Sequence, residues 1–216
     1  MDPRPPSPPS NEESVSSPAT IAYALRGNCY LNVTSRCTLR CSFCPKFNHT
    51  WVIGGADLRL HQEPSLDQVL AAVGEPRIYQ EIVFCGLGEP TLRLYDVLDI
   101  AAELHQRGAH RVRIDTDGLA NLVYGRDVTP DLEGPINALS ISLNAQNEEI
   151  YERHCCPTLP HSYAAMLEFA DRARDFVPDI TLTAIDGLEG VSMAACEDVA
   201  RRLGVKFRRR VLNDVG

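Results

Sequence analysis

Three closely spaced cysteines, Cys37, Cys41 and Cys44, form the pattern C-x3-C-x2-C. Three thiolates at this spacing can each bind one iron of a cubic iron–sulfur cluster, whereas an electron-carrying cluster normally has a cysteine on each of its four irons. A cluster held by three cysteines leaves one iron open, and a substrate or cosubstrate can bind and be reduced there. The spacing therefore predicts redox chemistry at an open iron.

A second interpretation of the same cysteines stays open. A fourth ligand from elsewhere in the chain, such as Cys29, His49 or Cys85, would close a zinc site or an iron–sulfur site. The protein would then be a metal-binding or electron-transfer module that performs no chemistry on a cosubstrate. The open site is favoured, because no further ligand follows the three cysteines at short spacing.

The composition limits the classes of function. The chain has 216 residues, of which 44% are apolar, and this is enough for one core. Its formal net charge of -8 argues against a broad nucleic-acid surface. The N-terminus lacks the order of a secretory signal, and no apolar run reaches the ~18 residues of a membrane helix. We therefore expect a cytoplasmic protein without a membrane segment, whose eight cysteines are thiols or metal ligands.

The first part of the chain differs in composition from the rest. Residues 1–22 are rich in proline and serine and hold few large apolar side chains, so we expect a disordered tail. Residues 23–216 are expected to form a single domain.

From residue 28 onward, β-branched runs alternate with amphipathic segments, a pattern typical of βα units around a parallel sheet. The pattern predicts strands over 29–34, 81–85, 111–116, 138–144, 180–185 and 205–211. It predicts helices over 66–73, 92–106, 148–154, 163–176 and 192–203. A capping box at Ser65 and Gln68 begins the first helix, and Gly204 ends the last.

The predicted strands have one apolar and one polar face, unlike strands that are buried on both sides. On the third and fourth strands the polar set is Arg113, Asp115, Asp117, Ser140, Ser142 and Asn144. The last strand places Arg208 and Arg210 on the polar face, while Arg209 interrupts the apolar face. Right-handed βα connections curl such a sheet. We therefore expect an α/β fold, a partial (β/α)6 TIM-like barrel of parallel strands with outer helices and a ligand-binding interior. The alternative is a flat sheet with its polar face in water.

The cysteine pattern, with Phe43 just before the third cysteine, resembles the motif of the radical S-adenosylmethionine (SAM) superfamily. The run Gly86-Leu87-Gly88-Glu89-Pro90 is similar to the family's Gly-Gly-Glu element, with a spacing that differs by one residue. This resemblance spans residues 28–216. More narrowly, the segments IVFCGLGEPTLRL, DTDGLANL, ISLNA and RRVLNDVG resemble the TatD-associated radical SAM proteins.

The resemblance implies two cofactors, a [4Fe–4S] cluster on the three cysteines and SAM on its open iron. In the family, one electron from the cluster cleaves SAM into methionine and a 5′-deoxyadenosyl radical, which abstracts hydrogen from a substrate. Gly86 and Gly88 would let the backbone approach the methionine amine, and Glu89 would accept from it. The residues expected to bind SAM are Phe43, Gly86, Gly88, Glu89, Pro90, Asp115, Asp117, Ser140, Ser142, Asn144, Arg208 and Arg210.

Two further pairs of side chains carry more specific expectations. Arg208 and Arg210 indicate an anion, either the SAM carboxylate or a carboxylate or phosphate on the substrate. Ion pairs with Asp115 or Asp117 are the alternative for these arginines. The adjacent cysteines at 155–156, Cys155 and Cys156, are candidates for a hydrogen-atom donor near the mouth of the barrel.

The expected partners follow from the resemblance and from the length of the chain. Reductive cleavage needs a one-electron reductant such as flavodoxin or ferredoxin. The sixth predicted strand ends close to Gly216, so we expect an uncovered barrel mouth that suits a bulky substrate, a protein, a nucleic acid or a modified-base precursor. The narrower resemblance implies a functional association with a TatD-type nuclease.

Overall fold

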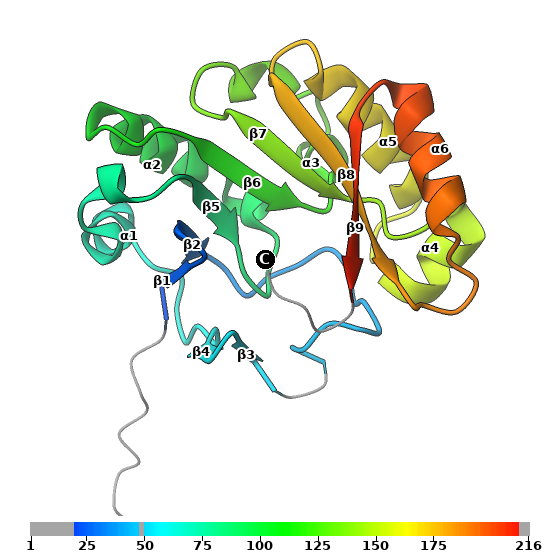
Figure 1. Cartoon of the computed structure of the whole chain (residues 1–216), viewed down its shortest axis with the longest axis horizontal. Helices are drawn as coiled ribbons and strands as arrows, with labels where there is room; N and C mark the ends of the chain where they lie inside the picture. The colour runs from blue at the N-terminus through cyan, green and yellow to red at the C-terminus, as the bar shows by residue number, and fades with distance from the viewer. Residues whose placement is uncertain (1–19, 48–49, 212–216) are drawn as a thin grey trace, which may run out of the picture.

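The computed structural model describes residues 20–47 and 50–211. Its main sheet has the strand order β1-β2-β5-β6-β7-β8-β9 (Figure 1). The first strand, β1 (Ala22–Leu25), is antiparallel to β2 (Asn28–Asn32). The strands that follow are all parallel: β5 (Ile82–Cys85), β6 (Val112–Thr116), β7 (Ala138–Ser142), β8 (Asp179–Asp186) and β9 (Lys206–Val211).

Helices connect the parallel strands. They are α1 (Leu66–Val73), α2 (Leu94–Gln106), α3 (Ala120–Tyr124), α4 (Glu148–Cys155), α5 (Ser162–Ala173) and α6 (Met193–Leu203), with short 3-10 turns at Pro76–Ile78, Pro90–Arg93 and Thr129–Leu132. The predicted capping box is present, since Ser65 accepts from the backbone of Gln68 and the Gln68 side chain accepts from the backbone of Ser65. Gly204 ends α6 in the left-handed conformation.

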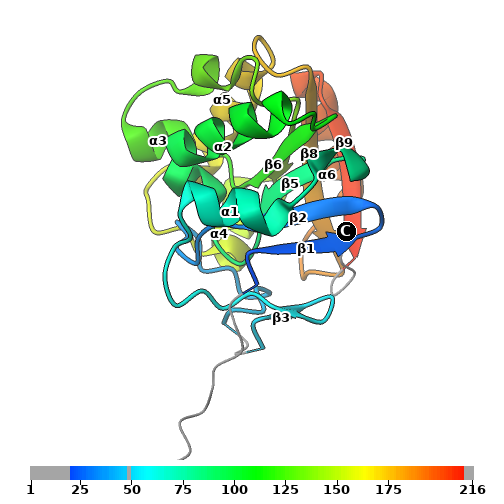
Figure 2. The ribbon, with the colours of Figure 1, turned by 90° about the vertical axis from the view of Figure 1, so that its left-hand side faces the viewer.

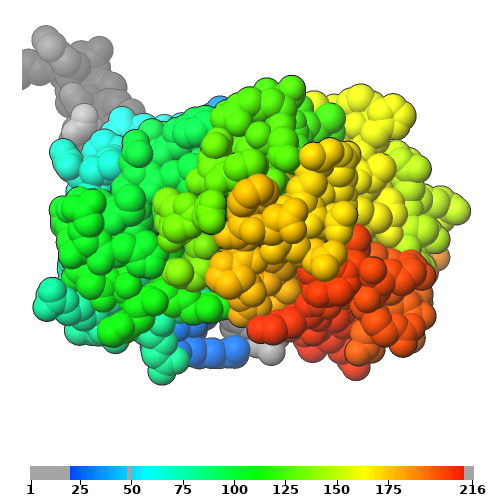
Figure 3. Space-filling model, turned by 90° about the horizontal axis from the view of Figure 1, so that it is seen from above, coloured from blue at the N-terminus to red at the C-terminus, as the bar shows by residue number. Residues whose placement is uncertain are grey.

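The helices cover one face of the sheet and the sheet curls away from them. Figure 2 shows α1 and α2 stacked over the outer face of β2, β5 and β6. Seen from above, the blue residues of the first strands and the red residues of β9 lie on the same side of the molecule (Figure 3). Within the described residues β1 and β9 are the two edge strands, so the barrel is not closed by strand pairing. The predicted partial barrel is confirmed.

The alternation of side chains gives this barrel an apolar outer layer and a polar inner layer. Ile114 and Ile141 belong to the buried core that contacts the helices. Between them in sequence, Ser140 and Asp115 lie side by side in the register of β6 and β7, on the opposite face. Packing against the helices therefore fixes which side chains face the interior.

Three features differ from the sequence prediction. The strand β1 was not predicted: its four residues straddle the end of the expected tail and are too few to show an alternation. Arg26 and Gly27, both with positive φ, turn it into β2. The two-stranded ribbon of β3 (Val52–Ile53) and β4 (Ala56–Asp57) and the five-residue helix α3 are too short to show a period. The rest of the expected tail, residues 1–19, lies outside the described residues.

The outer face of β9 also departs from the expected apolar layer. Val211 is 56% exposed, and Arg209 forms an ion pair with Asp186 of the neighbouring strand β8. The arginine that interrupted the apolar pattern is therefore paired on the surface of the sheet edge. Among the described residues no helix is long and apolar enough to cross a bilayer.

Candidate functional site

The cysteine loop, residues 33–47, leaves the end of β2 and crosses the carboxyl ends of the strands (Figure 1). Its backbone is bonded to the end of α4 and the residues after it. The Arg40 N–H donates to the Cys155 carbonyl at 3.0 Å and the Ser42 N–H to the His154 carbonyl at 2.9 Å. The Thr158 N–H donates in turn to a loop carbonyl, that of Thr38, at 2.9 Å. The loop is thus held across the barrel end by main-chain contacts.

The Gly-rich turn, residues 86–90, packs directly under the cysteine loop. The Glu89 N–H donates to the Arg36 carbonyl at 2.8 Å. A Cβ atom on Gly88 would lie 2.2 Å from the Thr34 carbonyl oxygen, so only glycine lets the two loops approach this closely. Gly86 has a φ of 120°, and a Cβ there would lie 2.5 Å from the Asn32 side chain. These glycines serve contacts within the chain, a role that the sequence alone did not indicate.

The carboxylate of Glu89 is 3% exposed and is surrounded by donors of its own chain. One oxygen accepts from the Thr91 N–H at 2.9 Å, the Thr91 hydroxyl at 2.7 Å and the Thr116 hydroxyl at 2.8 Å. The other oxygen accepts from the Asp117 N–H at 2.6 Å. These bonds tie the end of β5 to the end of β6. Burial, and then the charge of Asp117, raise the pKa of Glu89 above its usual range.

Asp117 links the same strand ends to the cysteine loop. Its carboxylate accepts from the Thr38 hydroxyl and from the Leu119 N–H. The residue is 4% exposed, and burial raises its pKa. The sequence placed Asp117 on the inner face with Asp115; in the structure it directly follows the last residue of β6 and bonds to the cysteine loop. The two aspartates therefore have different partners: Asp117 bonds to the cysteine loop, and Asp115 bonds to Arg113 within the sheet.

The three cysteine thiols lie within electrostatic range of one another along the loop. The negative charge of Cys41 acts on both Cys37 and Cys44. Burial raises the pKa of Cys37 and of Cys44, with a smaller opposing effect on Cys44 from Lys46. Among the described residues no three His, Cys, Asp or Glu side chains are arranged around a single metal ion.

A fourth thiol, that of Cys155 at the end of α4, lies against Cys41. The hydrogen bond between these two thiols, followed by burial, raises the pKa of Cys41. Cys155 is 0% exposed, and its sulfur accepts from the Asn144 amide at 3.6 Å. Cys156, the next residue, is exposed, and its thiol donates to the Arg153 carbonyl at 3.5 Å. Cys155 thus lies beneath the cysteine loop, away from solvent.

The other cysteines named as fourth ligands lie elsewhere. Cys29 is buried in the core that faces the helices. Cys85 is near the hydroxyl of Tyr23, at 3.9 Å, and burial raises its pKa to about 12. His49 lies outside the described residues.

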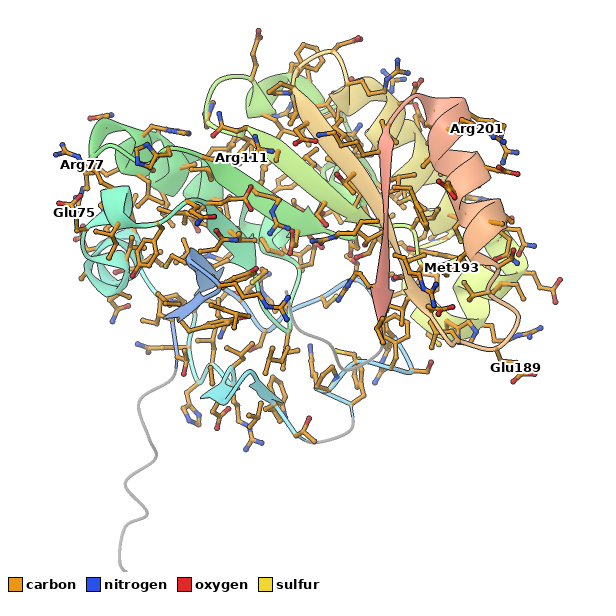
Figure 4. The ribbon with its side chains drawn as sticks, in the orientation of Figure 1. Glu75, Arg77, Arg111, Glu189, Met193 and Arg201 are labelled. Carbon is orange, nitrogen blue, oxygen red and sulfur yellow. The ribbon has the colours of Figure 1, made fainter. Side chains whose placement is uncertain are left out.

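The inner face of the sheet carries a network of charged side chains. Arg113 bonds to Glu81 at 2.8 Å and also to Asp115. Arg111, labelled at the start of β6 in Figure 4, bonds to Glu81 at 2.8 Å and to Asp179 at 2.6 Å. This network joins the start of β6 to Glu81, which precedes the adjacent strand β5, and to the first residue of β8, two strands away.

Arg208 and Arg210 complete the inner face on β9. The Arg208 guanidinium donates to the Ser140 hydroxyl at 3.3 Å, and its Nε is buried with no acceptor. The charges of Arg208 and Arg210 both act on Asp115. Neither arginine forms an ion pair within the part of the chain that the structure describes, because Asp115 is bonded to Arg113 instead. The ion pairs considered for them in the sequence are therefore not formed.

The remaining predicted residues lie around the carboxyl ends of the strands. Ser142 is the last residue of β7 and is half-buried. Asn144 is buried with a φ of 55°, and its side-chain oxygen has no hydrogen-bond partner. Phe43 packs against the core, and Pro90 is the buried first residue of a 3-10 turn.

Cationic and aromatic side chains gather on the cysteine loop and the segment that follows it. The ammonium of Lys46 lies 5.5 Å from the Phe47 ring and 6.0 Å from the Trp51 ring. Arg40 lies 5.9 Å from the same Phe47 ring, and Arg59 lies 5.3 Å from Trp51. We call these five residues the cation–aromatic patch.

Some residues that shape the site had no signal in the sequence. Glu63 accepts from the Arg36 guanidinium at 2.7 Å and from the Thr34 hydroxyl at 2.5 Å, and so braces the cysteine loop from 27 residues or more away in sequence. The Arg93 guanidinium donates to the Val33 carbonyl at 2.8 Å. Such long-range contacts follow from the fold and are not marked by a local motif.

The donor set fits an iron–sulfur cluster. All eight cysteines are described and free, and the three of the loop are half-buried at one end of the barrel. In a cubic cluster each thiolate binds a different iron, so the sulfurs need not converge on one point. The orphaned oxygen of Asn144, two residues after the end of β7, and the unpartnered Nε of Arg208 on β9 are polar atoms that a ligand inside the barrel could satisfy.

Comparison with known proteins places this arrangement in a family. The family model described as the radical SAM superfamily matches residues 31–203. No curated protein matches the chain significantly.

Solved structures share the fold at low sequence identity. A structure of TYW1 with a bound lysine-pyruvate adduct has a TM-score of 0.59 at 16% identity, over 86% of this chain and 64% of that one. A radical SAM methyltransferase from Sphaerobacter thermophilus has a TM-score of 0.57 at 17% identity, over 88% of this chain and 68% of that one. SuiB from Streptococcus suis with its precursor peptide has a TM-score of 0.60 at 12% identity, over 85% of this chain and 38% of that one. The chain thus spans less than two thirds of the TYW1 and SuiB chains.

Proposed function

Because this chain belongs to the radical SAM superfamily, we propose that Cys37, Cys41 and Cys44 bind the family's [4Fe–4S] cluster and that the protein cleaves SAM reductively. Members of this superfamily are enzymes whose cofactors are that cluster and SAM. When bound, the two cofactors supply a 5′-deoxyadenosyl radical, which takes a hydrogen atom from the substrate. The observation that carries the proposal is the cysteine loop fixed across the carboxyl ends of the strands.

The proposed SAM site divides into residues that shape it and residues that contact it. Gly88 and Glu89 shape it, because their own-chain contacts hold the Gly-rich turn against the cysteine loop. Backbone groups of this turn are then the part that meets the methionyl end of SAM. The residues that we propose as the surrounding wall are Phe43, Gly86, Pro90, Asp115, Asp117, Ser140, Ser142 and Asn144. Of the two anions considered for Arg208 and Arg210, we propose a group on the substrate and not the SAM carboxylate.

Asn144 is the member of this wall with the clearest need for a ligand. Its side-chain oxygen is buried and accepts no hydrogen bond, although its amide donates to Cys155. An unsatisfied buried acceptor is costly, and a ligand hydroxyl or amine would satisfy it. This supports a hydrogen bond from a hydroxyl or amine of SAM to the Asn144 side-chain oxygen.

We also propose a subgroup, a substrate class and a cellular location for this protein. The resemblance of several segments to TatD-associated radical SAM proteins supports membership of that subgroup and a functional link to a TatD-type nuclease. SuiB, which shares the fold, has been solved with a precursor peptide, and a macromolecular substrate is our first choice for this protein. A modified-base precursor is the second. We further propose a catalytic core domain over 23–216 and a cytoplasmic location, which the free state of all eight cysteines supports.

The cation–aromatic patch supports a one-electron reductant as partner. It lies on the cysteine loop and the segment that follows it, in a chain whose net charge is -8. A positive patch on an acidic protein attracts an acidic partner locally. Flavodoxin or a ferredoxin is the class of reductant that we propose to bind there.

The test is anaerobic reconstitution with iron and sulfide, followed by dithionite and SAM. We expect a brown protein that forms 5′-deoxyadenosine, and we expect Cys37→Ala to lose both the iron and the product. Cys196→Ala on α6 is the matched control, because Cys196 is a buried core thiol far in sequence from the loop. Bound zinc, or a full cluster without product, would favour a closed metal-binding or electron-transfer module and reject the proposal.

A further inference from the structure

Two arginines of β9 project onto the inner face of the barrel without an ion-pair partner among the described residues. Arg208 makes one hydrogen bond, of 3.3 Å, to the uncharged Ser140 hydroxyl. Its Nε is buried and has no acceptor. Buried donors on a charged group are normally bonded to protein, water or ligand. The buried Nε of Arg208 therefore lacks the acceptor that such a donor normally has, and a ligand could supply it.

The charges around these arginines do not balance. The charges of both arginines act on the carboxylate of Asp115, which is already bonded to Arg113. Arg208 and Arg210 are two residues apart on one strand face, and burial, together with the positive charge of Arg208, lowers the pKa of Arg210. We call Arg113, Arg208 and Arg210 the arginine wall. Arg113 is paired with both Glu81 and Asp115, whereas Arg208 and Arg210 have no ion-pair partner among the described residues.

The position of Arg208 separates it from the cysteine loop. Its guanidinium contacts Ser140, which lies one inner-face position before Ser142, the last residue of β7. Two residues along a strand span about 7 Å. The head group is therefore directed toward the depth of the barrel, whereas the cysteine loop and the Gly-rich turn lie at the carboxyl ends of the strands.

We propose that Arg208 and Arg210 bind an oxyanion, a carboxylate or a phosphate group, on the substrate of the enzyme. This inference rests on the proposed function in one respect, because the bound anion belongs to a substrate only if the protein is an enzyme. The oxyanion site itself is formed by side chains of β9. Guanidinium groups bind such anions through paired N–H donors, and the free Nε of Arg208 supplies one of them. The anion supplies the negative charge that the arginine wall lacks.

The test measures anion binding by the full-length, anaerobically reconstituted protein with SAM present. Inorganic phosphate and malonate are titrated separately by calorimetry, and the anion that binds more tightly identifies the group. The variants are Arg208→Met, Arg210→Met and Arg208→Lys, the last of which keeps the charge but removes Nε. Arg209→Met is the matched control, because Arg209 lies on the other face of the same strand and is paired with Asp186.

We expect each of the three inner-face variants to weaken binding of the preferred anion about tenfold or more, and the control to change it by less than about twofold. The SAM affinity should stay within about twofold in all four variants, which also shows that they are folded. The proposal is overturned if neither anion binds, if Arg209→Met weakens binding equally, or if the inner-face variants weaken SAM instead. If the protein binds the anion through these arginines but forms no 5′-deoxyadenosine, the oxyanion site stands and the proposed function fails.

Discussion

The two parts of the barrel interior are built in opposite ways. The thiol end, which we define as Cys37, Cys41, Cys44, Glu89 and Asp117, carries thiols and carboxyl groups, and its carboxylates accept bonds from their own chain. The arginine wall carries guanidinium groups, and two of its three members have no ion-pair partner among the described residues. The thiol end is therefore a rigid frame, and the arginine wall keeps donors available for a ligand.

The difference in charge predicts how ligands are oriented inside the barrel. Thiolates and buried carboxylates favour positive charge nearby, which iron and the sulfonium and amine of SAM supply. The arginine wall favours negative charge, which a substrate oxyanion supplies. A substrate with an anionic group would thus be held at one side with its reactive carbon directed toward the other.

The largest expected effect tests which thiols belong to the thiol end. Cys41→Ala should lower bound iron to background and lower 5′-deoxyadenosine formation by about 100-fold or more, because it removes a cluster ligand. Cys155→Ala removes the thiol that touches Cys41 but should leave iron content unchanged and product within about threefold. Iron per protein and product by chromatography are the measurements. If Cys155→Ala also loses the iron, Cys155 is a ligand and the open-site assignment fails.

The second effect tests whether the thiol end is a rigid frame. Gly88→Ala places a Cβ 2.2 Å from the Thr34 carbonyl and 2.7 Å from the Arg36 carbonyl, and both are backbone atoms. We expect the free energy of unfolding to fall by about 3 kcal/mol and cluster assembly to fall with it.

Gly125→Ala is the control for this substitution. Gly125 has a φ of 65° but nothing within 4 Å of an added Cβ, so only the backbone conformation is strained. Its cost should be about 1 kcal/mol, with normal iron content. Denaturant unfolding and iron analysis measure both. Equal iron loading in the two variants would show that the contact between the loops is adjustable and not rigid.

The sequence predicted the frame better than the contacts within it. The six predicted parallel strands are present, because alternating apolar residues such as Leu139 and Ile141 must face the helices whatever the details. The same alternation placed Arg208 on the inner face. It could not show that Asp117 accepts from the Thr38 hydroxyl, nor that Cys155 lies against Cys41. Those contacts join segments about 80 and 114 residues apart, which only tertiary packing brings together.

A third effect tests whether the cation–aromatic patch is the docking surface for the reductant. Arg40→Glu and Lys46→Glu reverse charge on the cation–aromatic patch, so reduction by flavodoxin at low salt should slow about tenfold. Reduction by dithionite, a small molecule, should change by less than about twofold, and high salt should narrow the flavodoxin difference. Stopped-flow absorbance of the cluster gives both rates. Equal slowing with the two reductants would mean that the substitutions damage the cysteine loop and not a docking surface.

The smallest effect tests the balance of charge on the arginine wall. Asp115→Asn removes the one carboxylate whose charge acts on both Arg208 and Arg210, while Arg113 keeps its bond to Glu81. The carboxylate of Asp115 offsets part of the positive charge of the guanidinium groups. Its removal should therefore tighten phosphate or malonate binding about threefold. Asp186→Asn is the matched control, since Asp186 pairs with Arg209 on the outer face and its loss should leave anion binding unchanged. Weaker binding in Asp115→Asn would show that this carboxylate orients the arginines for the ligand. Asp115 would then be a structural part of the arginine wall, and the contrast between a negative thiol end and a purely positive wall would be wrong.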